Sequence, residues 1–514
     1  MKYAKYILIT CCLSFTACND VIDLYPQSNL NTGTYYSTLD EIKTGLMGCY
    51  NGLQAPMVNE WQLTELRSDN SKMGVPASSS STNRDLSDLD MFIPATIHNA
   101  MYSYWISTYL NIRNANIIID RLGANYDPAT GSITLSDINI PMSDADRKQL
   151  IGEALFIRGY HYLNLVRLFG GVFLVHEPLS ADKAKTINRS TVAETYKLIE
   201  NDLKTASAYL SASKFGAIAS TSIGKANQWS AKALLGKMYL TQNKKTEAAA
   251  QLQDVVTNSG YSLQKKYSDV FSTTNEMNSE ILFTIRYKAG GLGLGSGFAN
   301  NFAALNSGST ILNGSGSGNN TPTTELISLY TDKDTRKATN IAVFGTGTAA
   351  VYYVPKYLSP VVLSFDAEND WPIIRFADVL LMLAEAQGFK AESIALINQV
   401  RVRAGLAALT ETVNSVETFE KALADERRLE FAFENHRFFD LVRYNTTMNT
   451  IKAEQTLKNH FALEYTSHYA QYTAPVPTLV QLQGYVTTDK LLLPIPQREI
   501  DTNPSLNIQQ NPGY

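Results

Sequence analysis

The sequence predicts a mainly α-helical protein, in which tetratricopeptide-like helix pairs form a scaffold joined by long loops and a few short strands. Three observations predict this class. Apolar residues recur at helical spacing over long runs, helix-start signals precede several of these runs, and residues 226–261 have the spacing of a tetratricopeptide unit. A chain of 514 residues can also bury a large core, because the buried fraction rises with length.

The chain begins with a segment typical of export. Two lysines precede the apolar residues 6–15, a stretch too short for a bilayer, which needs about 20 apolar residues, but as long as a signal-peptide core. A pair of small residues then precedes Cys18, as in bacterial lipoproteins. We therefore expect residues 1–17 to be a cleaved lipoprotein signal and Cys18 to carry the lipid. An ordinary secretory signal with an unrelated cysteine is the alternative.

Cysteine and charge content argue against other classes. Once the signal is removed and Cys18 is acylated, only Cys49 remains, and one thiol cannot form an intramolecular disulfide. The net charge of −4 at pH 7 argues against a nucleic-acid-binding protein, which would carry a basic field. No stretch after the signal has the length and apolarity of a membrane span.

The expected helices follow one another along the chain. Asp144 opens a helix that is apolar on nearly every face, which is typical of a buried helix, and Gly170 ends it. Thr191 and Glu194 have capping-box spacing in front of the next helix. The expected ranges, of which the last two each hold a helix pair, are 37–53, 102–122, 144–169, 191–210, 226–261 and 375–405. A Gly-, Ser- and Asn-rich insertion, residues 288–320, lies between the two pairs, and a loop of that length is usually functional or disordered.

Seven stretches together resemble the SusD/RagB family of lipoproteins of Bacteroidetes. They occur in order from residue 18 to the end of the chain, and it is their number and order that make the resemblance specific. They are CNDVIDLYPQS, ELRSDN, GEALFIRGYHYLNLVRLFGGVFLV, ISLYTDKDTR, PIIRFADVLLMLAEA with NQVRVRAGL, ERRLEFAFENHRFFDLVRY and LLLPIPQREIDTNPSLNIQQNPGY. The chain departs from the family at QGFKAES, a connection shorter than in most members.

The resemblance implies both a fold and a function. It implies one SusD-like domain over residues 18–514, with an N-terminal part at 18–215 and a C-terminal part at 225–514. It further implies a surface-exposed outer-membrane lipoprotein, anchored through Cys18, that captures oligosaccharides and acts as the lid of a SusC-like TonB-dependent transporter. Peptides or another nutrient are the alternative cargo. The family implies no enzyme activity, and we expect no cofactor, metal or nucleic acid.

Ligand contacts are expected in three loops, at 59–85, 286–302 and 352–371. Sugars need flat aromatic faces with planar donors and acceptors, and peptides need similar groups beside strand-like edges. The first two loops lie where family members commonly place contacts, whereas Trp105 and Trp229 fall on core faces of helices and are not counted. For each candidate alone, an ordinary loop residue is the alternative. The candidates are Trp61, Asp69, Asn70, Asn83, Arg84, Tyr287, Phe298, Asn300, Tyr352, Tyr353 and Trp371.

Two rival functions stay open. A surface glycosidase would use two carboxylates about 5–10 Å apart, and Glu426, Glu430 and Glu434 form a stripe at i, i+4 that could supply them. Flanking arginines and phenylalanines favour a buried, ion-paired row instead. The six histidines form no metal motif, and His161 is expected to be a core residue of its buried helix. The second rival is a structural helical-repeat adaptor without a small ligand.

Overall fold

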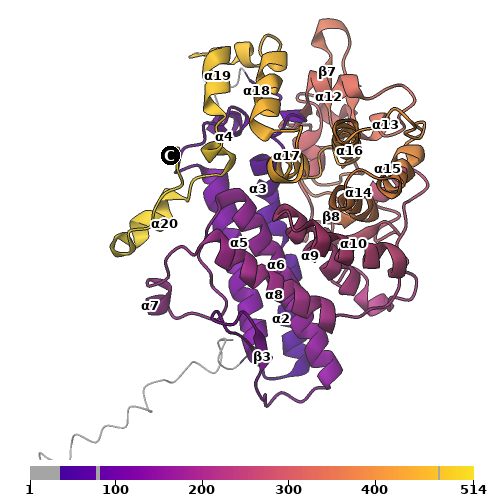
Figure 1. The fold of residues 1–514 in the computed structure, drawn as a ribbon. Helices are drawn as coiled ribbons and strands as arrows, with labels where there is room; N and C mark the ends of the chain where they lie inside the picture. Colours follow the sequence, from indigo (N-terminus) through magenta and orange to yellow (C-terminus); the bar gives the residue numbers. More distant parts are fainter. Residues whose placement is uncertain (1–34, 77–80, 473–474) are drawn as a thin grey trace, which may run out of the picture.

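The computed structural model describes residues 35–76, 81–472 and 475–514 and is mainly helical (Figure 1). The helices of the first half are α2 (Leu39–Asn51), α3 (Gln54–Thr64), α4 (Ser81–Asp90), α5 (Asn99–Arg121), α6 (Asp144–Phe169), α7 (Ala181–Ala184), α8 (Val192–Tyr209), α9 (Gln228–Thr241) and α10 (Lys245–Asn258). Those of the second half are α11 (Phe298–Phe302), α12 (Thr324–Leu329), α13 (Lys337–Asn340), α14 (Phe376–Gln387), α15 (Ala391–Arg403), α16 (Val416–Glu430), α17 (Arg437–Thr447), α18 (Ala453–Glu464), α19 (Leu479–Tyr485) and α20 (Gln497–Thr502). The expected signal segment and Cys18 lie outside the described residues.

The strands are short and pair two at a time in the described chain, always antiparallel. They are β1 (Ser71–Lys72), β2 (Ala124–Tyr126), β3 (Ile133–Leu135), β4 (Ile281–Ile285), β5 (Thr321–Pro322), β6 (Ala342–Phe344), β7 (Val351–Tyr353) and β8 (Trp371–Arg375). The pairs are β1 with β5, β2 with β3, β4 with β8 and β6 with β7. In the buried β4–β8 pair, Ile281 lies opposite Arg375 and Ile285 opposite Trp371.

Local signals in the sequence explain where several helices begin and end. α2 and α8 both open with a capping box, and in α8 the Thr191 hydroxyl accepts from the Glu194 N–H at 3.1 Å. α6 ends where Gly170 adopts a φ of 74°, a left-handed conformation that glycine adopts without steric cost. The expected helix ranges are confirmed within a few residues at each end. Among the described residues, no helix has the length and apolarity needed to cross a membrane.

Successive helices pack side by side to form the scaffold. α5, α6, α8, α9, α10, α14 and α15 each contact the next in this order (Figure 1). Small residues allow the close approaches: a Cβ placed on Gly236 of α9 would lie 2.7 Å from Leu252 of α10. The two expected helix pairs are therefore α9 with α10 and α14 with α15, and the predicted mainly α-helical class with tetratricopeptide-like pairs is confirmed.

Candidate ligand-binding site

Four of the expected contact residues belong to one buried aromatic cluster. Trp371 has no exposed surface and stacks on Tyr357, with ring centroids 4.7 Å apart and planes inclined by 7°. Phe298 lies 4.6 Å from the Trp371 ring and 5.4 Å from the Tyr287 ring. Trp61 reaches the same cluster from α3 and is also buried. The expectation that Trp61, Phe298 and Trp371 face a ligand is therefore corrected, because these rings pack against one another inside the protein. Tyr287 packs against Phe298 but also lines the hollow described below, so its role in binding stays a prediction.

Asp69 and Asn70 are also buried, and they hold the ELRSDN segment onto α16 and α17. Arg437 Nε donates to Asp69 Oδ1 at 2.7 Å, and Arg428 Nε donates to Asn70 Oδ1 at 2.8 Å. Burial raises the pKa of Asp69, but the two arginines outweigh this effect and hold the pKa well below its usual range. Both residues thus serve the scaffold, which corrects their expected role as ligand contacts.

The other loop candidates on α4 and β7 keep some access to solvent. Asn83 is half-buried and Arg84 is exposed on α4, in a range that was expected to be a loop. Tyr352 is 43% exposed on β7, and Tyr353 beside it is half-buried. These four side chains come from elements in opposite halves of the chain (Figure 1). Their role in binding stays a prediction.

The carboxylate stripe of α16 is a buried ion-pair network. One nitrogen of Arg336 lies 2.6 Å from Glu426 and 3.2 Å from Glu430, and Arg375 lies 2.9 Å from Glu430 and 2.7 Å from Glu434. We call the charged network the set Glu280, Asp334, Arg336, Lys356, Arg375, Arg403, Glu426, Glu430 and Glu434. Burial raises the pKa of Glu430, but the surrounding arginines lower it to about 2. All three carboxylates of the row are buried and paired with arginines, so the predicted ion-paired row is confirmed here.

The predicted core histidine is also confirmed. His161 is 1% exposed, and its Nε2 lies 2.8 Å from the side-chain amide of Asn111. Burial lowers the pKa of His161 to about 3, so the ring is neutral in the folded protein. Within the described ranges, no three His, Cys, Asp or Glu side chains are grouped so that they could hold a metal ion.

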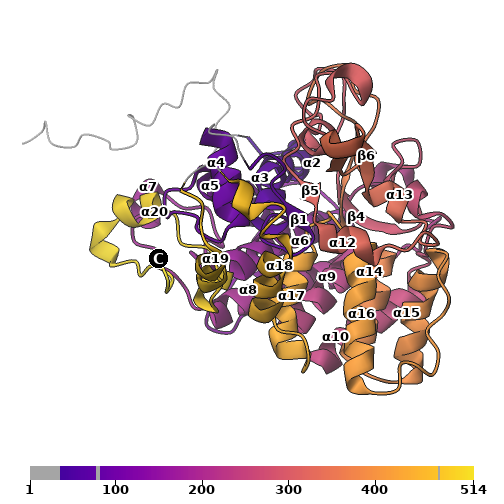
Figure 2. The ribbon, with the colours of Figure 1, turned by 90° about the horizontal axis from the view of Figure 1, so that it is seen from above.

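The long insertion is an ordered lobe with a core of its own. Residues 288–320 pack against residues 358–368, and we call these two segments together the loop lobe. Figure 2 shows the salmon-coloured loops of this region, near β6, projecting from the helical body. α11 joins the lobe to the scaffold, because its two phenylalanines belong to the main core, whereas Ala299 and the following Ala303 belong to the small core. That small core consists of Ala299, Ala303, Leu312, Val361 and Ala367.

Two side chains fasten the loops of the lobe together. The buried Asn300 donates to backbone carbonyls of the 313–315 turn at 3.0 and 2.9 Å, and its oxygen accepts from the Phe365 N–H at 2.8 Å. Asp366 accepts from the two N–H groups of residues 290–291, both at 2.8 Å. Asn300 was expected to contact a ligand; it instead joins two loops, because all its polar atoms are directed at backbone groups.

The lobe exposes an apolar surface that the sequence reasoning missed. Leu292, Val362, Leu363 and Phe365, which we call the apolar raft, are 65, 82, 50 and 47% exposed. A Cβ on Gly291 would lie 3.1 Å from Leu363, so the two loops that carry the raft are in contact. Phe365 holds a φ of 60°, an unusual value for a bulky residue. The sequence does contain a sign of this surface. Apolar residues occur in the loop-like stretches GGLGLG and SPVVLSF without the spacing of a helix or a strand.

A hollow opens at the base of the lobe beside the raft. Its volume is about 460 Å³, within the range of roughly 300–1,000 Å³ that is usual for ligand pockets. Leu294 closes a short hairpin with Lys288 and lines the hollow, while Leu292 lies at the tip of the same hairpin. Gln54 of α3 donates to the Arg286 carbonyl at 2.6 Å at the wall. The polar lining of the hollow includes Asn51, Gln54, Lys225, Arg286 and Lys288.

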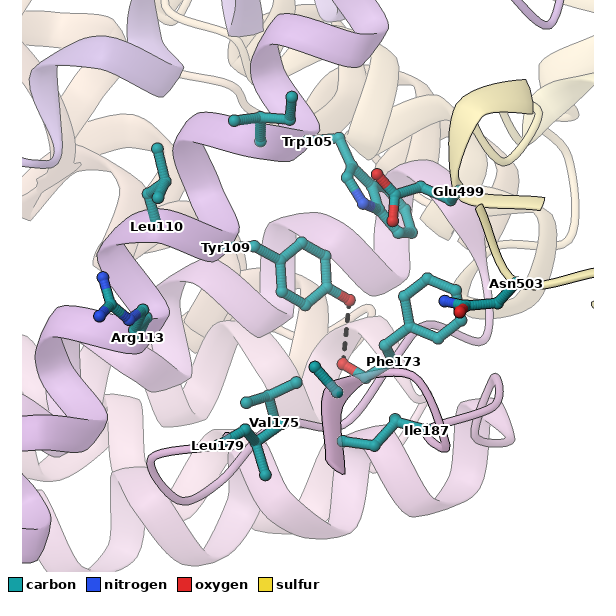
Figure 3. A pocket seen from close by; sticks show the side chains of 12 residues that line it. Trp105, Tyr109, Leu110, Arg113, Phe173, Val175, Leu179, Ile187, Glu499 and Asn503 are labelled. Atoms are coloured by element: carbon teal, nitrogen blue, oxygen red, sulfur yellow. Dashed lines mark hydrogen bonds between the residues drawn. The ribbon is translucent and has the colours of Figure 1, made fainter. Parts of the chain in front are cut away.

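A second, aromatic pocket of about 330 Å³ lies on α5 (Figure 3). Trp105, Tyr109 and Phe173 form its floor, and the Tyr109 hydroxyl donates to the Phe173 carbonyl at 2.9 Å. Glu499, from α20, lies beside the Trp105 ring. Burial raises the pKa of Glu499, and a hydrogen bond from Trp105 offsets this in part. Trp105 is 2% exposed, which confirms its expected core position even though its ring forms part of the pocket floor. The rest of the wall comes from α5, from residues 175–187 and from Asn503.

The chain resembles known proteins along its whole length. The family model described as "SusD family" matches residues 349–514, and the one described as "Starch-binding associating with outer membrane" matches residues 22–240, so that together they span more than half of the chain. A SusD-like protein of Formosa agariphila is 23% identical over 99% of this chain and 98% of its own length. A SusD-like protein of Bacteroides ovatus is 23% identical over 99% of this chain and 97% of its own length.

Solved structures share the fold. A "Laminarin binding SusD-like protein" is 26% identical and has a TM-score of 0.72, with 92% of this chain and 99% of that chain covered. Surface glycan-binding protein A from Bacteroides thetaiotaomicron, solved in complex with laminarihexaose, is 20% identical and has a TM-score of 0.71 over the same shares. The sequence signatures, the two family models and the shared fold agree, and the chain belongs to the SusD/RagB family.

Proposed function

We propose that this protein captures oligosaccharides at the base of the loop lobe and delivers them to a SusC-like TonB-dependent transporter, for which it acts as the lid. Cys18 would anchor it by lipid to the outer surface of the outer membrane. Family membership supports this role, as do two relatives of the same fold whose names record binding of laminarin and of laminarihexaose. The anchor rests on the lipoprotein pattern in front of Cys18.

The observation that carries the proposal is the hollow with its polar lining next to the apolar raft. Ligand pockets combine apolar walls with a few placed polar groups. Sugar hydroxyls would bind the amides and cations of Gln54, Arg286 and Lys288, and the C–H faces of the sugar rings would lie against Leu292 and Leu363. The hairpin at 288–294 contributes to both surfaces, so one chain of sugar units could contact both.

The test compares two double variants by calorimetric titration with a panel of oligosaccharides that includes laminarin fragments. Leu292→Ser with Leu363→Ser removes half of the raft. Val402→Ser with Val416→Ser changes two comparably exposed valines on α15 and α16, away from the lobe. We expect the raft variant to lose at least about tenfold in affinity, since truncating central contact residues costs more than about 1 kcal/mol each. Equal affinities of the two variants would contradict this location of the site.

A peptide cargo is the second candidate, and the composition of the raft favours it. All four tryptophans of the sequence are buried, and three of the four raft residues are aliphatic. Sugar platforms are aromatic faces, whereas aliphatic surfaces suit apolar peptide side chains. The same titrations with a set of short apolar peptides separate the two: binding of peptides alone, lost in the raft variant, would replace the oligosaccharide by a peptide.

We infer that the protein is not a hydrolase. Glu426 and Glu430, the carboxylates that a glycosidase would need, are at most 1% exposed and lie inside the charged network. Overnight incubation of the purified protein with the same oligosaccharides should release no shorter products by chromatography. Any product that forms in proportion to enzyme concentration would support the glycosidase instead.

The partner is tested by purifying the protein from gently solubilised membranes and identifying what accompanies it by mass spectrometry. Stable interfaces bury about 1,200–2,000 Å² or more, so a lid that covers its transporter should remain bound. We expect a TonB-dependent transporter in near-equal amounts. Its absence would contradict the lid role, while a transporter complex without any cargo binding would favour the structural adaptor.

A further inference from the structure

We propose that the aromatic pocket of α5 is the docking site of the protein's own N-terminal segment, Val21–Pro26. The sequence there is VIDLYP, the only apolar cluster between Cys18 and the first described residue. This inference does not depend on the cargo, and it concerns how the lipid-anchored end is held against the folded body. The segment itself lies outside the described residues, so its chemistry and its reach carry the argument.

The described chain starts beside α5, the helix that carries the pocket. The Tyr36 ring occupies the space beside Gly45 of α2 and Ile118 of α5, since a Cβ on Gly45 would collide with that ring. Burial raises the pKa of Tyr36, and the positive charge of Arg113 on α5 partly lowers the same pKa. Arg113 also lines the aromatic pocket. One residue thus lies near both the start of the described chain and the pocket.

The segment is long enough to reach the pocket floor. Arg113 and Trp105 are eight residues apart on α5, which is about 12 Å along a helix. Nine residues separate Pro26 from Tyr36, and an extended chain of that length spans up to about 30 Å. The intervening residues, QSNLNTGTY, are mostly polar, which suits a connection over the surface.

The pocket and the segment match in chemistry. Leu110 is 53% exposed at the pocket wall, and the floor is made of three aromatic rings, so the pocket offers an apolar surface open to solvent (Figure 3). Val21, Ile22, Leu24 and Tyr25 would cover it. Asp20 and Asp23 alternate with these apolar residues, and they would lie near Arg113 at the edge.

A short tether makes weak contacts sufficient. A flexible connection of this length gives an effective concentration in the millimolar range, so a segment that binds in trans with a Kd of about 100 µM would be docked about 90% of the time. Docking would leave only residues 18–20 between the lipid and the bound segment. The pocket face of α5 would then be the part of the fold nearest the membrane.

Disulfide trapping in the full mature chain tests the proposal. The chain carries Cys18→Ala and the pair Tyr25→Cys with Leu110→Cys, so that apart from the engineered pair only Cys49 remains, a buried thiol whose pKa burial raises to about 12. The control pair is Tyr25→Cys with Met47→Cys, because Met47 is an exposed apolar residue on α2, close to Gly45 and outside the aromatic pocket. We expect the pocket pair to oxidise at least tenfold faster than the control pair, as followed by mass spectrometry of tryptic peptides.

A further change separates docking from reach. Leu24→Asp in the trapping chain keeps the tether length but removes an apolar contact, and it should slow the pocket disulfide to the rate of the control. Equal rates for the two pairs, or a pocket rate that Leu24→Asp leaves unchanged, would overturn the proposal. A third outcome would also overturn the proposal. An oligosaccharide that binds the Cys18→Ala chain could prevent the pocket disulfide, and it could do so even when Leu292→Ser and Leu363→Ser are added to the trapping chain. The aromatic pocket would then bind cargo and not the N-terminal segment.

Discussion

The charged network and the loop lobe are neighbours in the chain, since residues 358–368 lead directly into β8, yet different interactions hold them. In the network, the single side chain of Arg375 forms ion pairs with Glu280, Glu430 and Glu434, and all four residues are buried. In the lobe, Asn300 and Asp366 bind backbone groups around a small core, and large apolar side chains face solvent. Removing one partner of a buried ion pair leaves an uncompensated charge in the interior, so the network tolerates few changes. A surface loop that is held by a few backbone contacts can instead present its side chains to a ligand.

The largest effect is expected from breaking the network. Arg375→Met would leave three carboxylates without their shared cation in the interior, which should lower the free energy of unfolding by at least about 3–5 kcal/mol. Chemical denaturation measures it. The matched change in the lobe is Lys288→Met, which removes the partner of Glu368 at an exposed position and should leave the denaturation midpoint unchanged. Equal losses in both variants would contradict the contrast between the regions.

The next effect concerns a buried carboxylate that forms no ion pair within the described ranges of the chain. Glu65 accepts from the Asn435 N–H at 2.5 Å, its other oxygen has no hydrogen-bond partner among the residues that the structure describes, and burial raises the pKa of Glu65 to about 8. Because the folded pKa lies above the unfolded value, the unfolded state releases this proton first. The wild type should therefore lose stability relative to Glu65→Gln as the pH rises from about 4.5 to about 8, by a few kcal/mol at most, and hold a constant difference above that.

Denaturation of both proteins between pH 4 and 9 checks this sign. The two should be similar in stability at pH 4, where the wild-type carboxyl is neutral in both states and close in shape to glutamine. An offset that stays the same over the whole range would show that Glu65 is ionised in the folded protein and paired in the manner of the network.

A smaller effect is expected where the scaffold helices touch. Gly236→Val would press against Leu252 of α10 and should cost about 1–3 kcal/mol, the usual range for overpacking. Gly484→Val in α19 is the control, because no atom of the described part of the chain lies within 4 Å of a Cβ at that position. The thermal midpoint of the control should change little. If Gly236→Val is as stable as the control, the helix pair is looser than described.

The smallest effect on global stability is expected in the lobe. Asp366→Ala removes the acceptor for the N–H groups of Gly290 and Gly291 at a half-buried position on the lobe. The global unfolding transition should not move, while amide exchange in residues 288–296 should become faster. If the lobe instead unfolds together with the scaffold, Asp366→Ala should lower the midpoint of the global unfolding transition and leave the local amide exchange rates unchanged.

The candidate site could be located only in part from the sequence. The loops 286–302 and 352–371 do contribute the lobe and its raft, but the residues chosen within them were mostly the wrong ones. Phe298 and Trp371 pack inward, whereas the exposed large apolar side chains of these loops are two leucines, a valine, Phe365 and, of the chosen residues, Tyr352. Residue type alone favours aromatic contacts, and it cannot show which aromatic rings find partners inside the protein.

The sequence by itself determined the helices, their caps, the two helix pairs, the paired carboxylate row and the family. These features depend on residues a few positions apart, as with Thr191 and Glu194, or on a long run of matching motifs. The tertiary structure decided which loop side chains are buried and where the hollow and the aromatic pocket lie. Trp61 meets Phe302, and Asp69 meets Arg437, across hundreds of residues, so their burial is set by partners that no local pattern specifies.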